Sequence, residues 1–292
     1  MSDPASDRWV VRTEQGDPGD PGGDTWIAAL HLPAARALVA GTWMRRLTNP
    51  LFFFILALGW MLPPLTALFV WSTAAEGGPV AGFDRGAFVA YYLVLVAVTQ
   101  LTRTENSYYV GGAIYSGQMN AWLLRPMPPH YEALALDLSY KGITAVTVLP
   151  FVGALALLMG PTLHPAPWQV LCFVPAVVAG WALSFAWSYA LALLAFWLQK
   201  MEAVYGLQAA LTFVLAGQVA PVALLPDGLR QSAAALPFRY MAAFPAELLT
   251  AAPTPDDVVR GFCWQGTWLA AVLVLAALLW RRGVRRYAAV GG

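Results

Sequence analysis

Residues 142–199 read GITAVTVLPFVGALALLMGPTLHPAPWQVLCFVPAVVAGWALSFAWSYALALLAFWLQ and contain no Asp, Glu, Lys or Arg. A helix needs about 20 mostly apolar residues to cross a bilayer, so this stretch is too long for one crossing. It divides at GPTLHPAPW (160–168), because three prolines and a glycine in so short a run cannot continue a helix. The stretch therefore predicts two membrane-spanning helices, over 142–159 and 168–198.

The rest of the chain contains four more apolar runs of similar character, at 51–71, 86–102, 203–223 and 261–280. Of all residues, 59% are hydrophobic and 11% are charged, whereas soluble domains have about a quarter charged residues. We predict an all-α integral membrane protein with six transmembrane helices, which places both termini on one side. Pro63 and Pro64 lie inside the first span and predict a kink there.

The segment before the first span has two parts. Residues 1–26 are acidic and rich in Gly and Pro, without the apolar core of a secretory signal, and we expect a disordered tail. Residues 27–292 are then a single transmembrane domain. Within it, 27–47 mixes apolar residues with three arginines and ends in Arg45-Arg46, which favours an N-terminal amphipathic helix at the membrane interface. A plain linker is the alternative.

The basic residues are distributed unevenly between the two sides that six spans define. If the N-terminus is cytoplasmic, the outer side holds four of the 17 Lys and Arg residues: Arg85, Arg230, Arg239 and Arg260. The other thirteen fall on the inner side. Because cytoplasmic loops carry the excess of Lys and Arg, we expect both termini to be cytoplasmic.

The inner segment 102–137 looks helical from Ile114 to Leu124 and ends at Arg125-Pro126, a helix stop signal. We interpret this short, moderately polar helix as a docking surface; a loop helix lying on the membrane is the alternative. The outer segment 221–260 is too charged to span the membrane. It predicts two short helices, Leu229–Leu236 and Met241–Leu249, of re-entrant or interfacial type.

Several kinds of chemistry are missing from the sequence. Lys141 and Lys200 are the only lysines and neither follows a Gly-rich loop, so a P-loop for ATP is excluded. The histidines lie far apart and lack metal-ligand spacing; they are His31, His130 and His164. We therefore predict no catalytic residues, no metal and no cofactor bound by this chain.

The cores of the predicted spans contain no ionisable residue, which disfavours an ion-coupled transporter. Asp137 and Lys141 lie one helical turn apart at the start of the third span, where we expect an interfacial ion pair. Gln208, Thr212 and Gln218 in the fifth span either contact a substrate in a translocation pathway or form hydrogen bonds between helices.

Three stretches carry a resemblance to a known family. They are GGAIYSGQMNAWLLRPMPP (111–129), the outer LPDGLRQSAAALPFRYMAAFPAELL (225–249) preceded by Pro221, and the C-terminal 265–292. In this order, and within the six-span layout, they resemble ABC export permeases of the ABC-2-type membrane family. Within it they resemble a branch in which two different permease chains commonly pair.

The resemblance implies a separate cytoplasmic ABC ATPase dimer, which holds ATP and Mg. It implies a second permease subunit, in a homodimer or heterodimer, and export of a substrate. It also places ATPase coupling on residues of 117–126, with Met119 and Trp122 facing the ATPase or the first amphipathic helix. These coupling residues are Gly117, Met119, Asn120, Trp122, Leu124, Arg125 and Pro126. An outer gate falls on Pro221, Pro226, Pro237, Phe238, Tyr240 and Pro245.

The low charge of the spans favours a hydrophobic or amphipathic substrate. We expect membrane lipids as further partners, no nucleic acid, and a place in the plasma (bacterial inner) membrane. Two other classes stay open: a secondary transporter, and a membrane enzyme. The enzyme would need a polar cluster at the outer interface, for which the candidates are Asp227, Arg230, Arg239 and Glu247.

Overall fold

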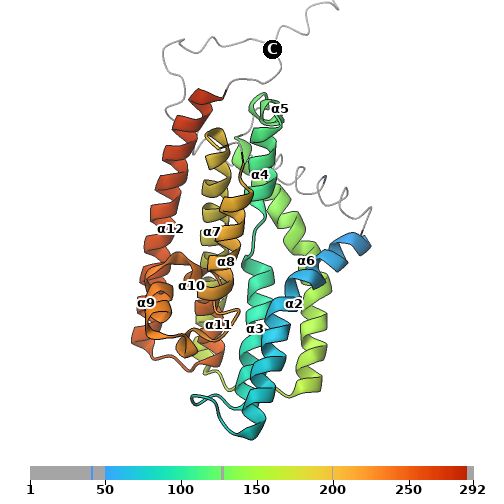
Figure 1. Cartoon of the computed structure of the whole chain (residues 1–292), viewed down its shortest axis with the longest axis vertical. Coiled ribbons are helices and arrows are strands. Elements are labelled where there is room, and N and C mark those ends of the chain that lie inside the picture. Colours follow the sequence, from blue (N-terminus) through green and yellow to red (C-terminus); the bar gives the residue numbers. More distant parts are fainter. Residues whose placement is uncertain (1–40, 42–49, 126–127, 199, 288–292) are drawn as a thin grey trace, which may run out of the picture.

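The computed structural model describes residue 41 and residues 50–125, 128–198 and 200–287. Apart from Gly41, the predicted tail and amphipathic helix lie outside these ranges. In the described parts of the chain every regular element is a helix, with a single isolated bridge between Val80 and Phe83. Figure 1 shows the long helices running along one axis, with α5 (Met119–Leu123) at the end of the molecule where α12 also ends.

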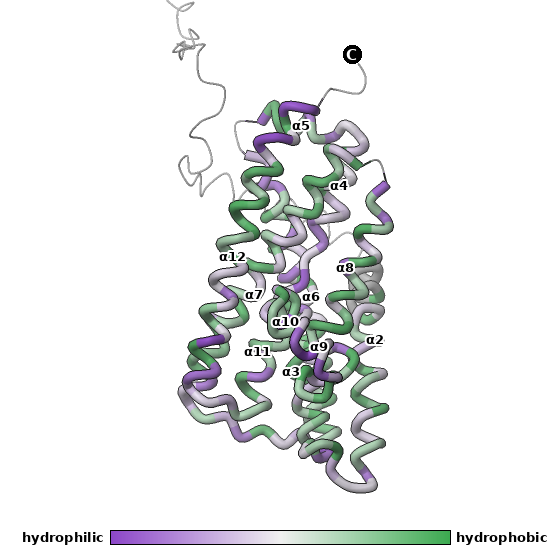
Figure 2. The backbone as a smooth tube through the Cα atoms, turned by 60° about the vertical axis from the view of Figure 1, so that its left-hand side comes forward, coloured by the Kyte–Doolittle hydropathy of each residue, from purple (hydrophilic) through white to green (hydrophobic). Residues whose placement is uncertain are grey.

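Five helical stretches are long and apolar enough to cross a membrane. They are α2 (Pro50–Ala74), α3 (Arg85–Thr102) continued by α4 (Asn106–Tyr115), α6 (Pro129–Met159), α7 (Pro167–Leu193) and α12 (Pro255–Gly283). Apolar side chains on their outer faces are strongly exposed; Leu157 on α6 is 90% exposed and Leu171 on α7 is 76% exposed. Figure 2 shows the long helices as mostly hydrophobic. These features confirm an all-α integral membrane protein.

Two of the spanning helices, α3 and α12, begin at side-chain caps. Asp84 accepts a hydrogen bond from the backbone N–H of Ala87 at 2.7 Å, which satisfies one of the free donors at the start of α3. At the start of α12, the side chain of Thr254 accepts from the backbone N–H of Asp257, whose carboxylate reaches back to Thr254. The helix α2 continues through Pro63 and Pro64, and its two halves run in different directions in Figure 1.

Helix α7 lies at the centre of the bundle, where it packs against α12, α4, α3 and the short helices α10 and α11. One large apolar cluster joins α7 to α4, α10, α11 and α12 around Leu183 and Leu193, both fully buried. A second cluster joins α2, α3 and α6 around Phe88 and Leu95. Short 3-10 turns extend three of the long helices: η1 (Ala75–Gly77) follows α2, η2 (Leu194–Phe196) follows α7 and η4 (Val284–Arg286) follows α12. A fourth, η3 (Val222–Leu224), lies between α8 and α9.

Two predicted spans differ from the structure. The third, predicted over 142–159, is the end of a longer helix, because α6 begins at Pro129 and continues through Asp137 and Lys141. The fifth, predicted over 203–223, is only α8 (Glu202–Leu215), 14 residues long. At about 1.5 Å per residue a helix of this length covers about two thirds of a hydrocarbon core.

Helix α8 stops where it does because Gly217 adopts φ +78°, a left-handed conformation that suits glycine at the end of a helix. The segment that follows is fixed to the bundle by three side chains. Tyr91 donates to the carbonyl oxygen of Gly217 at 3.1 Å, and Tyr92 and Trp71 both donate to that of Val219. These three hydrogen bonds therefore hold the turn after α8 in a fixed position.

Three short helices follow, in place of the two predicted ones: α9 (Asp227–Ala235), α10 (Pro237–Met241) and α11 (Ala243–Thr250). The amide of Gln265 on α12 is fully buried and donates to the carbonyl oxygens of Ala176 on α7 and Tyr240 on α10, both at 2.9 Å. This amide fixes α10 between two long helices. Figure 1 shows α9–α11 beside the part of α12 far from α5.

Candidate functional site

The predicted continuous helix from Ile114 to Leu124 is wrong, because three residues, 116–118, interrupt it. Helix α4 ends at Tyr115, and Gly117 adopts φ +79° before α5 begins at Met119. A left-handed residue cannot continue a right-handed helix, and glycine takes this conformation without a steric penalty. The two helices therefore form an elbow, which we call the α4–α5 elbow (residues 106–125).

The elbow has a buried side and an exposed side. Met119 is fully buried and belongs to the same apolar cluster as Val110, Ile114 and Ala133. On the other side Leu124 is 87% exposed and Tyr115 is 70% exposed. Of the predicted coupling residues, Met119 is thus part of the fold, Trp122 is half-buried against the core, and Leu124 and Arg125 face outward.

Arg125 also holds the elbow in place. Its guanidinium pairs with Glu132, near the start of α6, at 2.5 Å, although Arg125 itself is nearly half exposed. This pair joins the end of α5 to α6 across the short connection between them. Pro126, the last predicted coupling residue, lies outside the described residues.

The start of α4 is clamped between two other helices. The backbone N–H of Ser107 donates to the hydroxyl of Ser188 on α7 at 2.8 Å. The hydroxyl of Tyr205 on α8 donates to the carbonyl oxygen of Ser107 at 2.6 Å, and Tyr205 packs on the ring of Tyr108. The elbow is therefore connected to α6, α7 and α8 by specific polar contacts.

A cavity of about 420 Å³ lies beside this clamp, between α2, α3, α7 and α8, with the α10–α11 junction at its edge. Gln208, Thr212 and Gln218, the polar residues singled out in the fifth predicted span, all line it. The structure adds polar residues that the sequence reading missed, from α3, α7 and the α3–α4 break. These are Thr99, Thr102, Thr104, Ser184, Trp187 and Ser188.

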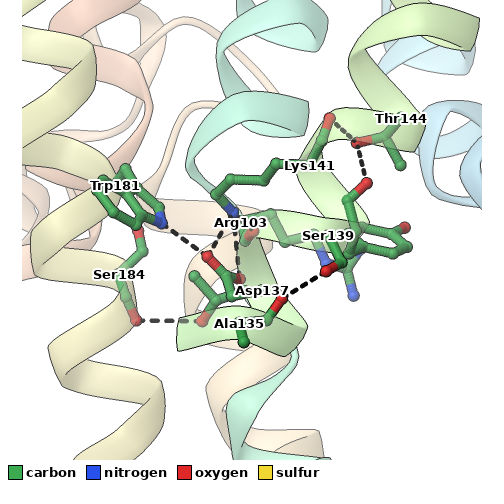
Figure 3. A network of polar contacts seen from close by, with 10 residues as sticks. Arg103, Ala135, Asp137, Ser139, Lys141, Thr144, Trp181 and Ser184 are labelled. Atoms are coloured by element: carbon green, nitrogen blue, oxygen red, sulfur yellow. Dashed lines mark hydrogen bonds and ion pairs between the residues drawn. The ribbon is translucent and has the colours of Figure 1, made fainter. Parts of the chain in front are cut away.

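Four charged residues lie at the break between α3 and α4 (Figure 3 shows three of them, with their neighbours). Lys141 donates at 2.5 Å to the carbonyl oxygen of Arg103, which has no hydrogen-bond partner within α3. Lys141 also forms an ion pair with Asp137 at 3.2 Å. Asp137 in turn accepts from the indole N–H of Trp181 on α7 at 2.7 Å. The predicted ion pair between Asp137 and Lys141 is therefore confirmed, and the side chains of both residues are largely buried in the protein.

The other two charges face the cavity. Arg103 pairs with Glu105 at 2.6 Å, and its guanidinium lies 3.2 Å from the centre of the Trp60 ring on α2. Such a contact between a cation and an aromatic face is attractive, most of all where water is excluded. Helices α3–α4 and α6 extend further than the uncharged runs, so these charged residues lie within helical stretches that are long enough to cross a membrane.

Four of the six predicted gate residues lie on α10 and α11, and the other two precede α9. Pro237 begins α10, Phe238 is buried against Trp187 with ring centres 5.5 Å apart, and Tyr240 donates to the carbonyl oxygen of Ala234 at 2.6 Å. Pro245 is buried in α11. Pro221 is buried as well, whereas Pro226 is exposed at the start of α9.

The charged residues considered for a membrane enzyme form two separate pairs. Asp227 and Arg230 pair at 2.5 Å and are both exposed, whereas Arg239 and Glu247 pair at 2.7 Å and are largely buried. Two effects act on the pKa of Arg239: burial lowers it, and the carboxylate of Glu247 raises it. The effect of Glu247 is the stronger, so the pKa lies above its ordinary value. In the described residues no group of three or more His, Cys, Asp or Glu side chains is arranged to hold a metal ion.

The comparisons with known proteins agree with this architecture. No curated protein matches the sequence. The family profile described as "ABC-2 family transporter protein" matches residues 61–291, which covers α3 to α12 and most of α2. The chain, a multi-pass membrane protein built as the permease subunit of an ABC transporter, therefore belongs to the ABC-2 family of transporter proteins.

Proposed function

We propose that this chain is the transmembrane subunit of an ATP-driven exporter, in which the α4–α5 elbow docks on a cytoplasmic ATPase dimer. The exposed apolar surface of Tyr115, Leu123 and Leu124 carries this proposal. It lies at the end of the molecule where Arg281 and Arg282 end α12. An apolar patch amid a polar end is typical of a protein–protein contact. ATP and Mg then belong to the partner, and the chain needs no catalytic residue.

The contacts of the elbow provide a route for movement. A shift of α5 pulls on α6 through the Arg125–Glu132 pair, and a shift of α4 pulls on α7 and α8 through Ser107. Helices α7 and α8 line the cavity, so closure of the ATPase dimer reshapes the cavity wall. The substrate, a hydrophobic or amphipathic molecule, crosses through this cavity, and the residues around α10 and α11 form its outer gate.

A second permease subunit fits against α8. Ala203, Gly206 and Ala210 are exposed on one side of this helix, and a Cβ added at Gly206 would meet no atom within 4 Å. Small residues let two helix backbones approach closely in a membrane. The partner is a second copy or a different permease chain. We place the pair in the plasma membrane with both termini cytoplasmic, an orientation that the distribution of Lys and Arg supports.

Co-purification from native membranes in mild detergent, followed by an ATP hydrolysis assay, tests the proposal. Wild type is expected to bring down a P-loop ATPase. Arg125→Ala releases the end of α5 from Glu132, so we expect several-fold less ATPase recovered or stimulated. Arg230→Ala is the matched control, because it removes an exposed pair of the same 2.5 Å length on α9. The proposal fails if the chain purifies alone and binds no added ATPase.

A further inference from the structure

The charge of the cavity wall limits what the cavity can hold. Among its described lining residues the charged ones are Arg103 and Glu105, which pair with each other at 2.6 Å. One face of the Arg103 guanidinium is covered by the ring of Trp60. An ion that enters finds no free counter-charge, and a charge buried without a partner is strongly unfavourable. The cavity therefore discriminates against anions and cations.

Uncharged polar groups at the same wall lack partners. The hydroxyls of Thr99 on α3 and Thr212 on α8 are buried without a hydrogen-bond partner, and so is the indole N–H of Trp187 on α7. A buried polar group without a partner costs free energy, and a hydrogen bond from a bound molecule removes that cost. The three groups come from three helices that line one cavity, and the amides of Gln208 and Gln218 lie at the same wall.

The wall also has an apolar part. Trp60 on α2 and Phe213 on α8 line the cavity, and their side chains are partly exposed, by 40% and 37%. Aromatic side chains that line a pocket provide apolar surface on which a ligand packs. A ligand with an apolar body thus has a surface to pack on next to the polar groups.

We propose that the cavity binds an uncharged amphipathic molecule. Its hydroxyl or carbonyl groups bond to Thr99, Thr212 and Trp187, and its apolar body packs on Trp60 and Phe213. This inference rests on the proposed export function and names the class of its substrate. A volume of about 420 Å³ is within the usual range for small-molecule sites.

The test uses the full-length protein in lipid nanodiscs. The probe is dodecyl glucoside that carries a photoreactive diazirine in its alkyl tail. Two further probes keep the same alkyl tail and replace the glucose headgroup by an anionic phosphate or a cationic trimethylammonium group. After irradiation, mass spectrometry measures labelling of α3, α7 and α8 against probe concentration. We expect saturable labelling by the glucoside and at least about tenfold weaker labelling by the charged probes. Free glucose, which lacks an apolar body, is expected not to compete.

Valine variants separate binding from folding. Thr99→Val and Thr212→Val each remove a hydroxyl at nearly constant volume, and we expect about tenfold weaker glucoside labelling from each. Their melting temperatures should stay equal or rise, because the lost hydroxyls have no partner in the empty protein. Thr267→Val is the control; its hydroxyl donates to the carbonyl oxygen of Cys263, and labelling should stay within about twofold.

Equal labelling by a charged probe, or labelling that neither valine variant weakens, overturns the inference. These experiments need no ATPase, so their failure is distinguishable from failure of the proposed function. If an ATPase is recovered but glucoside labelling is not specific, the exporter function is supported and the proposed substrate class is rejected. If labelling is specific but no ATPase is recovered, the binding site is supported and the exporter function is rejected.

Discussion

At the scale of single residues, Lys141 explains how α3 can break inside a helix bundle. A break leaves carbonyl groups without partners, and an unpaired carbonyl in an apolar environment is costly. Lys141 donates to the carbonyl oxygen of Arg103, while Asp137 balances its charge and is itself held by Trp181. One side chain thus satisfies the backbone of α3 and joins α6 to it.

The first prediction concerns this pair. Lys141→Met leaves the carboxylate of Asp137, whose side chain is only 1% exposed, without its cation. Breaking a buried pair from one side costs about 3–5 kcal/mol, so the melting temperature in detergent should fall sharply. The double variant Lys141→Met/Asp137→Asn should recover part of the loss. A double variant as unstable as the single one would show that the charge pairing matters little.

The sequence predicts only some of the residues that line the cavity. Gln208, Thr212 and Gln218 were identifiable because polar side chains are rare in an apolar run. Thr99 and Trp187 were not, because a lone Thr or Trp in a span is ordinary, and only the packing of α3 against α7 brings them together. Asp137 and Lys141 were found as a pair, but their burial depends on Trp181, which is remote in sequence.

At the scale of elements, the turn after α8 determines where the short helices begin. Gly217 is left-handed and in close contact with Tyr91, whose hydroxyl occupies the space that a Cβ at this position would need. The hydrogen bond from Tyr91 to Gly217 fixes the turn against α3. The turn therefore depends on glycine for two independent reasons.

The second prediction follows from this turn. Gly217→Ala forces a left-handed alanine, at about 1–2 kcal/mol, and displaces the hydroxyl of Tyr91 as well. We expect a loss of about 2 kcal/mol or more, seen as a lower melting temperature. Gly266→Ala is the control, because Gly266 lies within α12 and a Cβ there meets no atom within 4 Å. Its melting temperature should stay equal or rise. A Gly217→Ala protein as stable as wild type would contradict this account of the turn.

The long helices show what hydropathy can and cannot predict. The uncharged runs identified α7 and α12, because lipid-facing helices must be apolar along their length. Hydropathy placed the start of α6 too late, because it treats Glu132, Asp137 and Lys141 as outside the membrane-spanning helix, whereas the fold pairs each of them. It also overestimated α8, because the apolar residues of 216–223 continue the pattern after the helix has ended.

At the scale of the whole molecule, the orientation in the membrane decides which end an ATPase can reach. The α4–α5 elbow and the end of α12 share one end, and the turn that contains η1 lies at the opposite end (Figure 1). Hydrophilic residues cluster around α5 in Figure 2. The proposed topology places the elbow in the cytoplasm and η1 outside.

The third prediction tests this orientation with single cysteines in a chain that carries Cys172→Ala and Cys263→Ala. A membrane-impermeant maleimide should label Glu76→Cys in η1 on intact cells, because Glu76 is well exposed. Gln118→Cys, in the elbow, should react only after the cells are permeabilised. The reverse pattern would place the elbow outside and exclude contact with a cytoplasmic ATPase.

Photo-crosslinking from Leu124 in native membranes tests the central claim, the docking of the elbow on an ATPase, most directly. With a benzophenone amino acid at position 124, 87% exposed in the isolated chain, we predict a crosslinked product that contains a P-loop ATPase. The same amino acid at Leu157, 90% exposed on the apolar face of α6, should give none and serves as the control. An ATPase product from position 157, or a position 124 that crosslinks only to lipid, would contradict the account.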